Sequence, residues 1–230
     1  MNAILVDVSA YERDGFAIVP NILSPPECDQ FKQEACRLIR ERECSTGKVY
    51  PVYLGAAAAS ERFYQLTDDP RIVAILRAIM PTGIMFLSDK LVFKSEQAKF
   101  ATPWHIDAAY WPNTRPKLSV WLPLDDATAS NGTLTVVRGS HQHEWKHNRS
   151  DTHETLGAFQ NIIRDRQWNP RDEVICNISR GSAIFFSDKL VHSSCSNTTG
   201  ADRFTIISTY HAPAADEVFD KDYPARHVIL

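Results

Sequence analysis

The sequence predicts a mainly β fold, a double-stranded β-helix (a cupin-like jelly-roll barrel) with flanking N-terminal α-helices. Strand-like patterns follow one another beyond residue 83, helical periodicity is confined to the residues before it, and strands do not alternate with helices as in βαβ units. We expect strands at 84–95, 117–124, 132–138, 173–178, 182–187, 189–196 and 202–211.

Two helices are expected before the first of these strands. Ser24-Pro-Pro-Glu27 is a capping box with proline at the first helical position, and apolar residues recur at helical spacing as far as Arg42. A second helix begins at Asp69-Pro70 and ends before Pro81-Thr-Gly83. We favour packing of both apolar faces on the barrel over partner binding. The irregular, aromatic stretch 50–59 between the helices is placed to reach the mouth of a site.

Length and composition favour one domain over residues 1–230. The net charge is −3, the isoelectric point is about 6.2 and no basic block occurs, which argues against nucleic-acid and membrane-surface partners. No apolar run approaches the roughly 20 residues of a membrane helix, and the N-terminus lacks a secretory pattern. Five scattered cysteines are expected to be reduced thiols. We therefore expect a cytoplasmic protein, whose oligomeric state the sequence leaves open.

A metal site is the first functional prediction. In Trp104-His-Ile-Asp107, His105 and Asp107 are separated by one residue, so extended backbone points both side chains the same way. This tripeptide alone is weak evidence, and His192 alone would be interpreted as a core histidine. Together the three residues match the 2-His-1-carboxylate triad, which holds Fe(II) on one face and leaves the opposite positions open. No thiolate is placed to favour zinc instead.

Arg203 is the second functional candidate, eleven residues after His192 at the start of an alternating strand pattern. Arg203, Thr205 and Ile207 share one face of that strand, opposite Phe204 and Ile206. A buried arginine is unfavourable unless it is paired, and a bound carboxylate would pair with it in a bidentate, charge-assisted contact. The strand alone is equally compatible with a surface arginine. With the triad, it indicates a non-haem iron, 2-oxoglutarate-dependent oxygenase.

From Tyr11 to about Pro213 the chain resembles the phytanoyl-CoA dioxygenase family of iron- and 2-oxoglutarate-dependent oxygenases. The order and spacing of several segments carry the resemblance: Glu12–Pro20, Trp104–Asp107, Val120–Asp126, Asn131–His141, Phe185–Phe186, His192–Ser194, Asn197 and Arg203. The chain departs from the family at Arg138, where a proline usually precedes Gly-Ser-His. Its last residues do not resemble a peroxisomal Ser-Lys-Leu signal, so phytanoyl-CoA itself is disfavoured as the substrate.

The resemblance implies a role for each candidate residue. His105, Asp107 and His192 would bind iron and form the catalytic centre, and Arg203 would grip the distal carboxylate of 2-oxoglutarate. The remaining co-substrate contacts would come from Ser194, Trp121 and, in a looser alignment, Lys90. The implied cofactors are Fe(II), 2-oxoglutarate as co-substrate and O2, with succinate and CO2 as products.

Hydroxylation of an unactivated C–H bond of a small molecule is the reaction that the resemblance favours. Halogenating relatives have a small residue where this chain has Asp107, so the intact carboxylate favours hydroxylation. Desaturation or oxidative cyclisation would use the same ligands and stays open. A catalytically silent, ligand-binding jelly roll is the alternative from another class, but it would be expected to lack one of the triad residues or Arg203. A metal enzyme without a keto acid would not need Arg203.

Substrate contacts are the least determined part of the prediction. Tyr110 and Trp111 flank the metal motif, and Phe159 lies in the segment 143–169, although aromatic residues are equally common in a plain core. The segment is long for a connection in a compact domain, so we expect a lid or an insertion. The histidines of residues 141–153 could suggest a second metal site, but no helix or strand phase brings them together.

Overall fold

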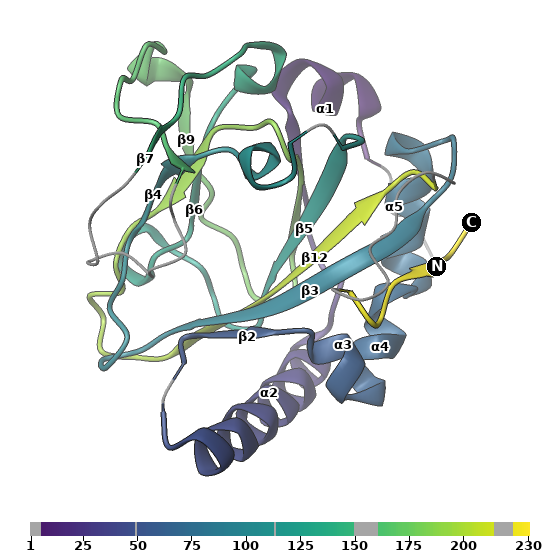
Figure 1. Cartoon of the computed structure of the whole chain (residues 1–230), viewed down its shortest axis with the longest axis vertical. Helices are drawn as coiled ribbons and strands as arrows, with labels where there is room; N and C mark the ends of the chain where they lie inside the picture. The colour runs from purple at the N-terminus through teal and green to yellow at the C-terminus, as the bar shows by residue number, and fades with distance from the viewer. Residues whose placement is uncertain (1–5, 49, 113, 150–160, 214–222) are drawn as a thin grey trace.

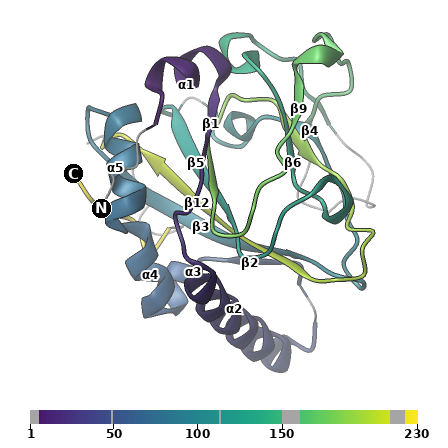
Figure 2. The same ribbon diagram turned by 180° about the vertical axis from the view of Figure 1, so that it is seen from behind.

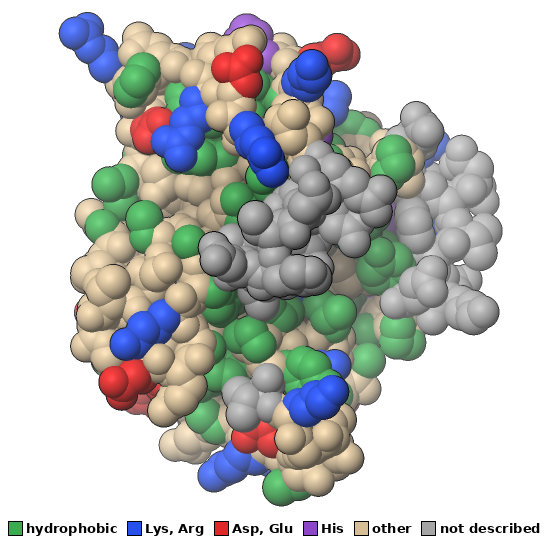
Figure 3. Space-filling view, turned by 60° about the vertical axis from the view of Figure 1, so that its left-hand side comes forward, with side chains coloured by type: hydrophobic (Ala, Val, Ile, Leu, Met, Phe, Trp, Pro, Cys, Tyr) green, Lys and Arg blue, Asp and Glu red, His purple; other side chains and the backbone are tan. Residues whose placement is uncertain are grey.

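The structure is a computed structural model, and it describes residues 6–48, 50–112, 114–149, 161–213 and 223–230. The chain folds into two facing β-sheets with helices on one side (Figure 1). None of the described helices is long and apolar enough to cross a membrane. On the face shown in Figure 3, the described lysine and arginine side chains are interspersed with acidic and hydrophobic ones.

The larger sheet has seven strands. They are β1 (Phe16–Val19), β2 (Val52–Leu54), β3 (Met85–Lys94), β5 (Lys117–Pro123), β10 (Ala183–Ser187), β12 (Arg203–His211) and β13 (His227–Val228). Their order is β1-β10-β5-β12-β3-β13, with β2 also paired to β3. The strand pairs are antiparallel throughout.

The smaller sheet has four strands in the order β4-β11-β6-β9. They are β4 (Thr102–His105), β6 (Leu134–Val137), β9 (Glu173–Ile175) and β11 (His192–Ser194). A separate pair consists of β7 (Asn148–Arg149) and β8 (Asn161–Ile162). Two antiparallel sheets that close on each other form the jelly-roll barrel that the sequence predicts.

Strand alternation divides the larger sheet into an inner and an outer face. On β12, Arg203 and Ile207 face the interior pocket, whereas Phe204 and Ile206 belong to a core on the other side. The predicted division of this strand is therefore confirmed. The same period of two turns Lys90, Val92 and Lys94 of β3 toward the pocket.

Helices cover the outer face of the larger sheet, away from the smaller sheet (Figures 1 and 2). They are α2 (Pro25–Thr46), α3 (Ala56–Ala59), α4 (Glu61–Thr67) and α5 (Pro70–Ile79). The first helix, α1 (Val8–Asp14), buries no residue, and the Asp14 carbonyl at its end accepts from the Gly139 amide in the turn after β6. The predicted capping box opens α2, where the Ser24 amide donates to Glu27 at 2.7 Å. The buried residues of α2 are the predicted apolar face: Cys28, Phe31, Ala35, Leu38 and Ile39.

The stretch 50–59 differs from the irregular loop that we expected. Val52–Leu54 forms β2 against β3, and Ala56–Ala59 forms the single turn α3. The cause is tertiary, because the buried carboxylate of Asp89 accepts hydrogen bonds from the Ala57 amide at 3.0 and 3.2 Å. Tyr50, Val52 and Leu54 reach the rim of the interior pocket, as expected for this stretch.

Candidate metal centre and co-substrate pocket

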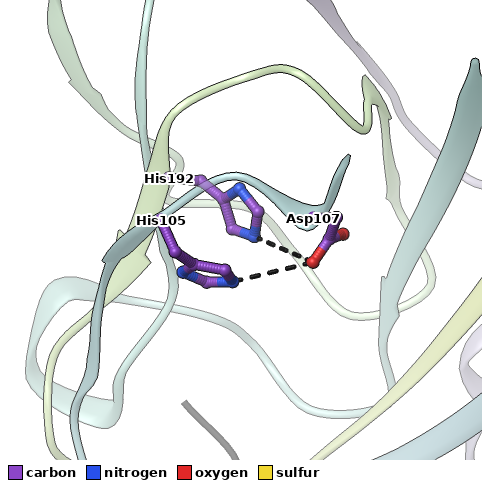
Figure 4. Close-up of side chains that lie close together, drawn as sticks. All are labelled: His105, Asp107 and His192. Carbon is purple, nitrogen blue, oxygen red and sulfur yellow. Dashed lines mark ion pairs between the residues drawn. The ribbon is translucent and has the colours of Figure 1, made fainter. Parts of the chain in front are cut away.

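Neighbouring strands of the smaller sheet bring the predicted metal ligands together. His105 is the last residue of β4 and pairs across the ladder with His192, the first residue of β11. Ile106 remains extended, so Asp107, which opens the 3₁₀ turn η1 (Asp107–Tyr110), returns to the side of His105. Figure 4 shows the three side chains pointing toward one another.

The three side chains are buried, and one ligand atom from each lies within 4.8 Å of the others. The Oδ1 atom of Asp107 lies 3.6 Å from Nε2 of His105 and 3.9 Å from Nε2 of His192. Each imidazole is also fixed from behind, because its Nδ1 lies 2.8–2.9 Å from a backbone carbonyl, Pro103 for His105 and Leu190 for His192. A carbonyl only accepts, so Nδ1 carries the proton and Nε2 is left as a ligand.

Electrostatics favours the ligand forms of these groups. Burial alone would raise the pKa of Asp107, but the neighbouring imidazoles of His105 and His192 and the charge of Lys90 hold it well below its usual range. Burial, together with His105, lowers the pKa of His192 to about 4. At neutral pH the site therefore offers a carboxylate and a neutral imidazole at His192. Two imidazoles and a carboxylate suit iron, so these residues fit that metal.

A pocket of about 470 Å³ lies between the two sheets, with the triad on its wall. It gathers all the sequence-predicted site residues that the structure describes: His105, Asp107, His192, Arg203, Ser194, Trp121, Lys90, Tyr110 and Trp111. Phe159 lies outside the described residues. The pocket also includes Lys94, Phe100, Gly132 and Arg42, which the sequence did not single out as site residues.

Arg203 is only 2% exposed and lies over the indole of Trp121, with 5.4 Å from the guanidinium carbon to the ring centre. Its Nε donates to the Asn131 carbonyl at 3.3 Å and one terminal nitrogen donates to Thr205. Among the described residues, no carboxylate forms an ion pair with it. Burial lowers its pKa to about 10, which still leaves a cation at neutral pH. A buried cation facing a pocket is the expected receptor of an anionic ligand.

Lys94 lies beside Arg203 and extends this cationic end of the pocket. The two residues pair across β3 and β12, and Lys94 is 1% exposed. Its ammonium donates to Ser194 Oγ at 2.7 Å and to the Cys195 carbonyl at 2.5 Å. Burial and the charge of Arg203 lower its pKa to about 7. The sequence signal that could have identified Lys94 is its strand phase, because it alternates in step with Val92 and Lys90.

Lys90 occupies a different part of the pocket from Lys94. It pairs with Ile207, four residues along β12 from Arg203. At about 3.3 Å per strand residue, Lys90 lies roughly 13 Å along β3 from Lys94. Its charge acts on Asp107 and His192, which places it toward the metal end. The co-substrate contact predicted for Lys90 stays a prediction, and Lys94 is the lysine beside Arg203.

The described ends of the segment 143–169 pack on the outer face of the smaller sheet. Ile163, Trp145 and Trp168 join a cluster with Trp104, which points away from the pocket. The segment nevertheless meets the metal motif, because the Ile163 amide donates to the Trp104 carbonyl at 2.7 Å. These ends are anchored beside His105 without lining the pocket. The part that would act as a lid, including Phe159, lies outside the described residues, so the lid stays a prediction.

Histidines of the 141–153 region do not form a metal site among the described residues, where the triad is the one cluster with metal-ligand geometry. His141 instead makes a structural contact, with Nε2 3.0 Å from the Glu12 carbonyl. Its ring packs so closely on Gly15 that a Cβ there would lie 2.4 Å from Nδ1. His153 lies outside the described residues.

Fold and donor set together define a class, the non-haem iron oxygenases with a jelly-roll barrel. The family described as phytanoyl-CoA dioxygenase (PhyH) matches residues 11–205. Among curated proteins, the chain is 24% identical to L-proline trans-4-hydroxylase of Streptomyces griseoviridis, covering 92% of this chain and 88% of the relative. It is 25% identical to ectoine dioxygenase of Nocardia farcinica, covering 89% and 76%.

Solved structures agree on the fold. EvdO2 from Micromonospora carbonacea var. aurantiaca, complexed with 2-oxoglutarate, superposes with a TM-score of 0.74 at 21% identity, covering 95% of this chain and 97% of that one. Because the family model covers residues 11–205, the chain belongs to the phytanoyl-CoA dioxygenase family. It is an iron- and 2-oxoglutarate-dependent dioxygenase, with Fe(II), 2-oxoglutarate and O2 as cofactor and co-substrates.

Proposed function

We propose that this enzyme hydroxylates an unactivated C–H bond of a small molecule at the centre formed by His105, Asp107 and His192. Arg203, with Lys94, Ser194 and Trp121 around it, binds the distal carboxylate of 2-oxoglutarate. The observation that carries the proposal is the convergence of the three buried ligand atoms within 4.8 Å on the wall of a pocket that also contains a buried arginine. A silent binding protein would not be expected to keep both features.

The residues around the pocket prepare each reactant. Carbonyl contacts at Nδ1 fix the rings of His105 and His192, so that both Nε2 atoms are presented together with the Asp107 carboxylate. When bound, Fe(II) with 2-oxoglutarate and O2 supplies an oxidant that abstracts hydrogen from a C–H bond, with release of succinate and CO2. Arg203 fixes one end of the co-substrate through a charge-assisted contact, and the Trp121 ring supports the guanidinium from below.

Substrate orientation comes from the aromatic wall beside the triad. The Tyr110 ring lies edge-on to His105, with 6.4 Å between ring centres. The Trp111 indole nitrogen donates to the Tyr223 hydroxyl at 3.0 Å, which holds that ring in place. We include both residues in the substrate site and assign the segment 143–169, with Phe159, to closure over it. Excluding water from the loaded pocket would suppress unproductive oxidation.

The relatives support a small-molecule substrate, because the curated ones are named for L-proline and ectoine. Two solved structures of the same fold are a carbocyclase and an epimerase of nogalamycin biosynthesis. Ring closure is therefore an alternative outcome at the same centre, as is desaturation, which would use the same metal ligands. The mass of the product distinguishes them, because hydroxylation adds an oxygen atom, whereas ring closure and desaturation each remove two hydrogens.

The test is a screen of small metabolites for compounds that increase succinate release in the presence of Fe(II), 2-oxoglutarate and O2. Mass spectrometry of each active compound then identifies the product. We expect succinate release that requires Fe(II), and a product heavier by one oxygen. A product lighter by two hydrogens would replace hydroxylation by desaturation or ring closure. No Fe(II)-dependent succinate under any condition would contradict the proposed function.

A further inference from the structure

The pocket carries an excess of positive charge. Among the described residues, its lining contains four basic side chains, Arg42, Lys90, Lys94 and Arg203, but only one carboxylate, Asp107. The charge of Fe(II) and that of dianionic 2-oxoglutarate cancel, so the described lining of the loaded pocket remains positive. Arg203 and Lys94 lie together at one end and are accounted for by the co-substrate. Lys90 and Arg42 are cations that the reaction, as proposed above, does not use.

Lys90 is the more informative of these two cations. It is half-buried on the inner face of β3, next in phase to Val92 and opposite Ile207, both of which line the pocket. In the part of the chain that the structure describes, its ammonium has no hydrogen bond or ion pair. Its charge nevertheless acts on Asp107 and His192. A half-buried ammonium beside apolar walls is stabilised when an anion binds to it.

Arg42 lies at the opening of the same pocket. Its guanidinium carbon is 4.9 Å from the ring centre of Tyr50 and 5.1 Å from that of Tyr53. Cation–π contacts hold the charge at the rim without neutralising it. A positive rim that leads to a second positive group inside raises the local concentration of anions and speeds their entry. The charges of the rim and of the interior thus both favour a negatively charged substrate.

We propose that Lys90 binds a carboxylate of the substrate, so that the substrate class is small, largely apolar carboxylic acids. The inference rests on the proposed function, because it places the substrate against the same metal centre. With the carboxylate on Lys90, the adjoining apolar carbons lie between the triad and the aromatic wall of Tyr110 and Trp111. Lys90 is then a determinant of substrate choice, whereas Arg203 and Lys94 serve the co-substrate.

The experiment measures binding without turnover. Enzyme is loaded with Fe(II) and 2-oxoglutarate in the absence of O2, and the visible charge-transfer band of that complex is followed during titration. The probes are hexanoate, cyclohexanecarboxylate and phenylacetate, each paired with its primary amide, which has the same shape but no charge. Trp111 and Trp121 line the pocket, so quenching of tryptophan fluorescence provides a second readout. The variants are Lys90→Met, Lys90→Arg and, as a matched control for loss of an exposed lysine, Lys189→Met.

We expect at least one acid to bind about tenfold or more tightly than its amide, a difference of about 1.4 kcal/mol. Lys90→Met should remove this preference, whereas Lys90→Arg and Lys189→Met should keep it. Affinity for 2-oxoglutarate should stay within about twofold in Lys90→Met, because its distal carboxylate binds at the other end.

Three results would overturn the inference. The first is that no acid binds better than its amide, including the case in which no probe binds. The second is that the preference survives in Lys90→Met. In the third, Lys90→Met weakens 2-oxoglutarate binding, which would assign Lys90 to the co-substrate instead. Failure of the proposed function gives a different signature in the unaltered enzyme, which would then release no Fe(II)-dependent succinate or would form a product without an added oxygen atom.

Discussion

Arg203 shows how burial of a single charge marks a ligand site. The side chain is 2% exposed, and its described partners are a carbonyl and a hydroxyl, neither of which cancels its charge. The sequence could predict this residue from its strand phase and spacing. Strand phase places Lys94 on the same face as Lys90, but the sequence could not show that Lys94 is the lysine beside Arg203 and Ser194. Phase alone did not distinguish Lys94 from Lys90.

Arg203→Ala should act mainly on the co-substrate. Loss of a charge-assisted contact to a buried carboxylate costs about 2–5 kcal/mol. The concentration of 2-oxoglutarate needed for half-maximal succinate release should therefore rise by roughly tens to thousands of times, with Fe(II) binding nearly intact. Exposed Arg171→Ala is the matched control and should change neither. An unchanged dependence on 2-oxoglutarate would move the anchor to Lys94 or Lys90.

Gly132 is required by both backbone conformation and space. Its φ is +83°, and a Cβ there would lie 2.4 Å from the Cys195 carbonyl and 2.7 Å from the Lys94 ammonium. Gly200 offers a matched control, with a φ of +77° but nothing within 4 Å. Both alanine variants should lose about 1–2 kcal/mol of unfolding free energy to left-handed strain. Only Gly132→Ala should also weaken 2-oxoglutarate binding, and equal affinities in the two variants would show that Lys94 does not need its present position.

Strands and long helices were the elements most accessible from the sequence. The phase of β12 and the buried face of α2 are as predicted. Each of these elements buries one face, so its apolar residues recur along the sequence with the period of the strand or helix. Several short elements were missed, and β2 and α3 are two of them. They are too short to show a period, and contacts with β3 hold them in place. Their formation depends on tertiary structure that no local pattern contains.

Asp89 links β3 to α3 and gives a pH-dependent stability. Burial raises its pKa from 3.8 to about 7, although backbone hydrogen bonds oppose the rise. The folded state therefore favours the protonated carboxyl. Its contribution to the free energy of unfolding is fully present below pH 3.8 and is lost as the pH rises through about 7. Asp89→Asn should gain stability relative to the unaltered enzyme across this interval, by up to about 1.4 kcal/mol per pH unit.

Chemical denaturation at a series of pH values measures the difference for Asp89→Asn. The exposed Asp165→Asn is the control for an aspartate outside the core. A difference that does not vary with pH would show that Asp89 is ionised in the folded state throughout.

The segment 143–169 separates into two testable parts. Trp168 packs on Trp104 and Trp145 at ring distances of 5.1 and 5.4 Å, on the outer face of the smaller sheet. Trp168→Ala should therefore lower the unfolding free energy by roughly 1–3 kcal/mol, and it should not change the ratio of 2-oxoglutarate consumed to product formed. Phe159→Ala should raise the ratio of 2-oxoglutarate consumed to product formed, because a lid excludes water. If Phe159→Ala leaves this ratio unchanged, Phe159 has no role in a lid.

At the scale of the whole molecule, the metal ligands and the co-substrate-binding residues come from different sheets. The smaller sheet supplies His105 and His192, and the larger one supplies Arg203, Lys94 and Trp121. Closing one sheet on the other creates the pocket of about 470 Å³ that contains both groups. The sequence could predict which residues belong to the site. Their division along the pocket, with one lysine at each end, required the register of β3 on β12.

The central claim, that the triad holds the iron to which 2-oxoglutarate binds, is tested most directly by His192→Ala. Circular dichroism should show that the variant is folded, because apolar burial maintains the barrel. Under anaerobic conditions, the unaltered enzyme should form the charge-transfer band of its Fe(II)–2-oxoglutarate complex and should release succinate once O2 is added. The folded variant should show neither. A folded His192→Ala enzyme with a normal band and normal succinate release would contradict the account.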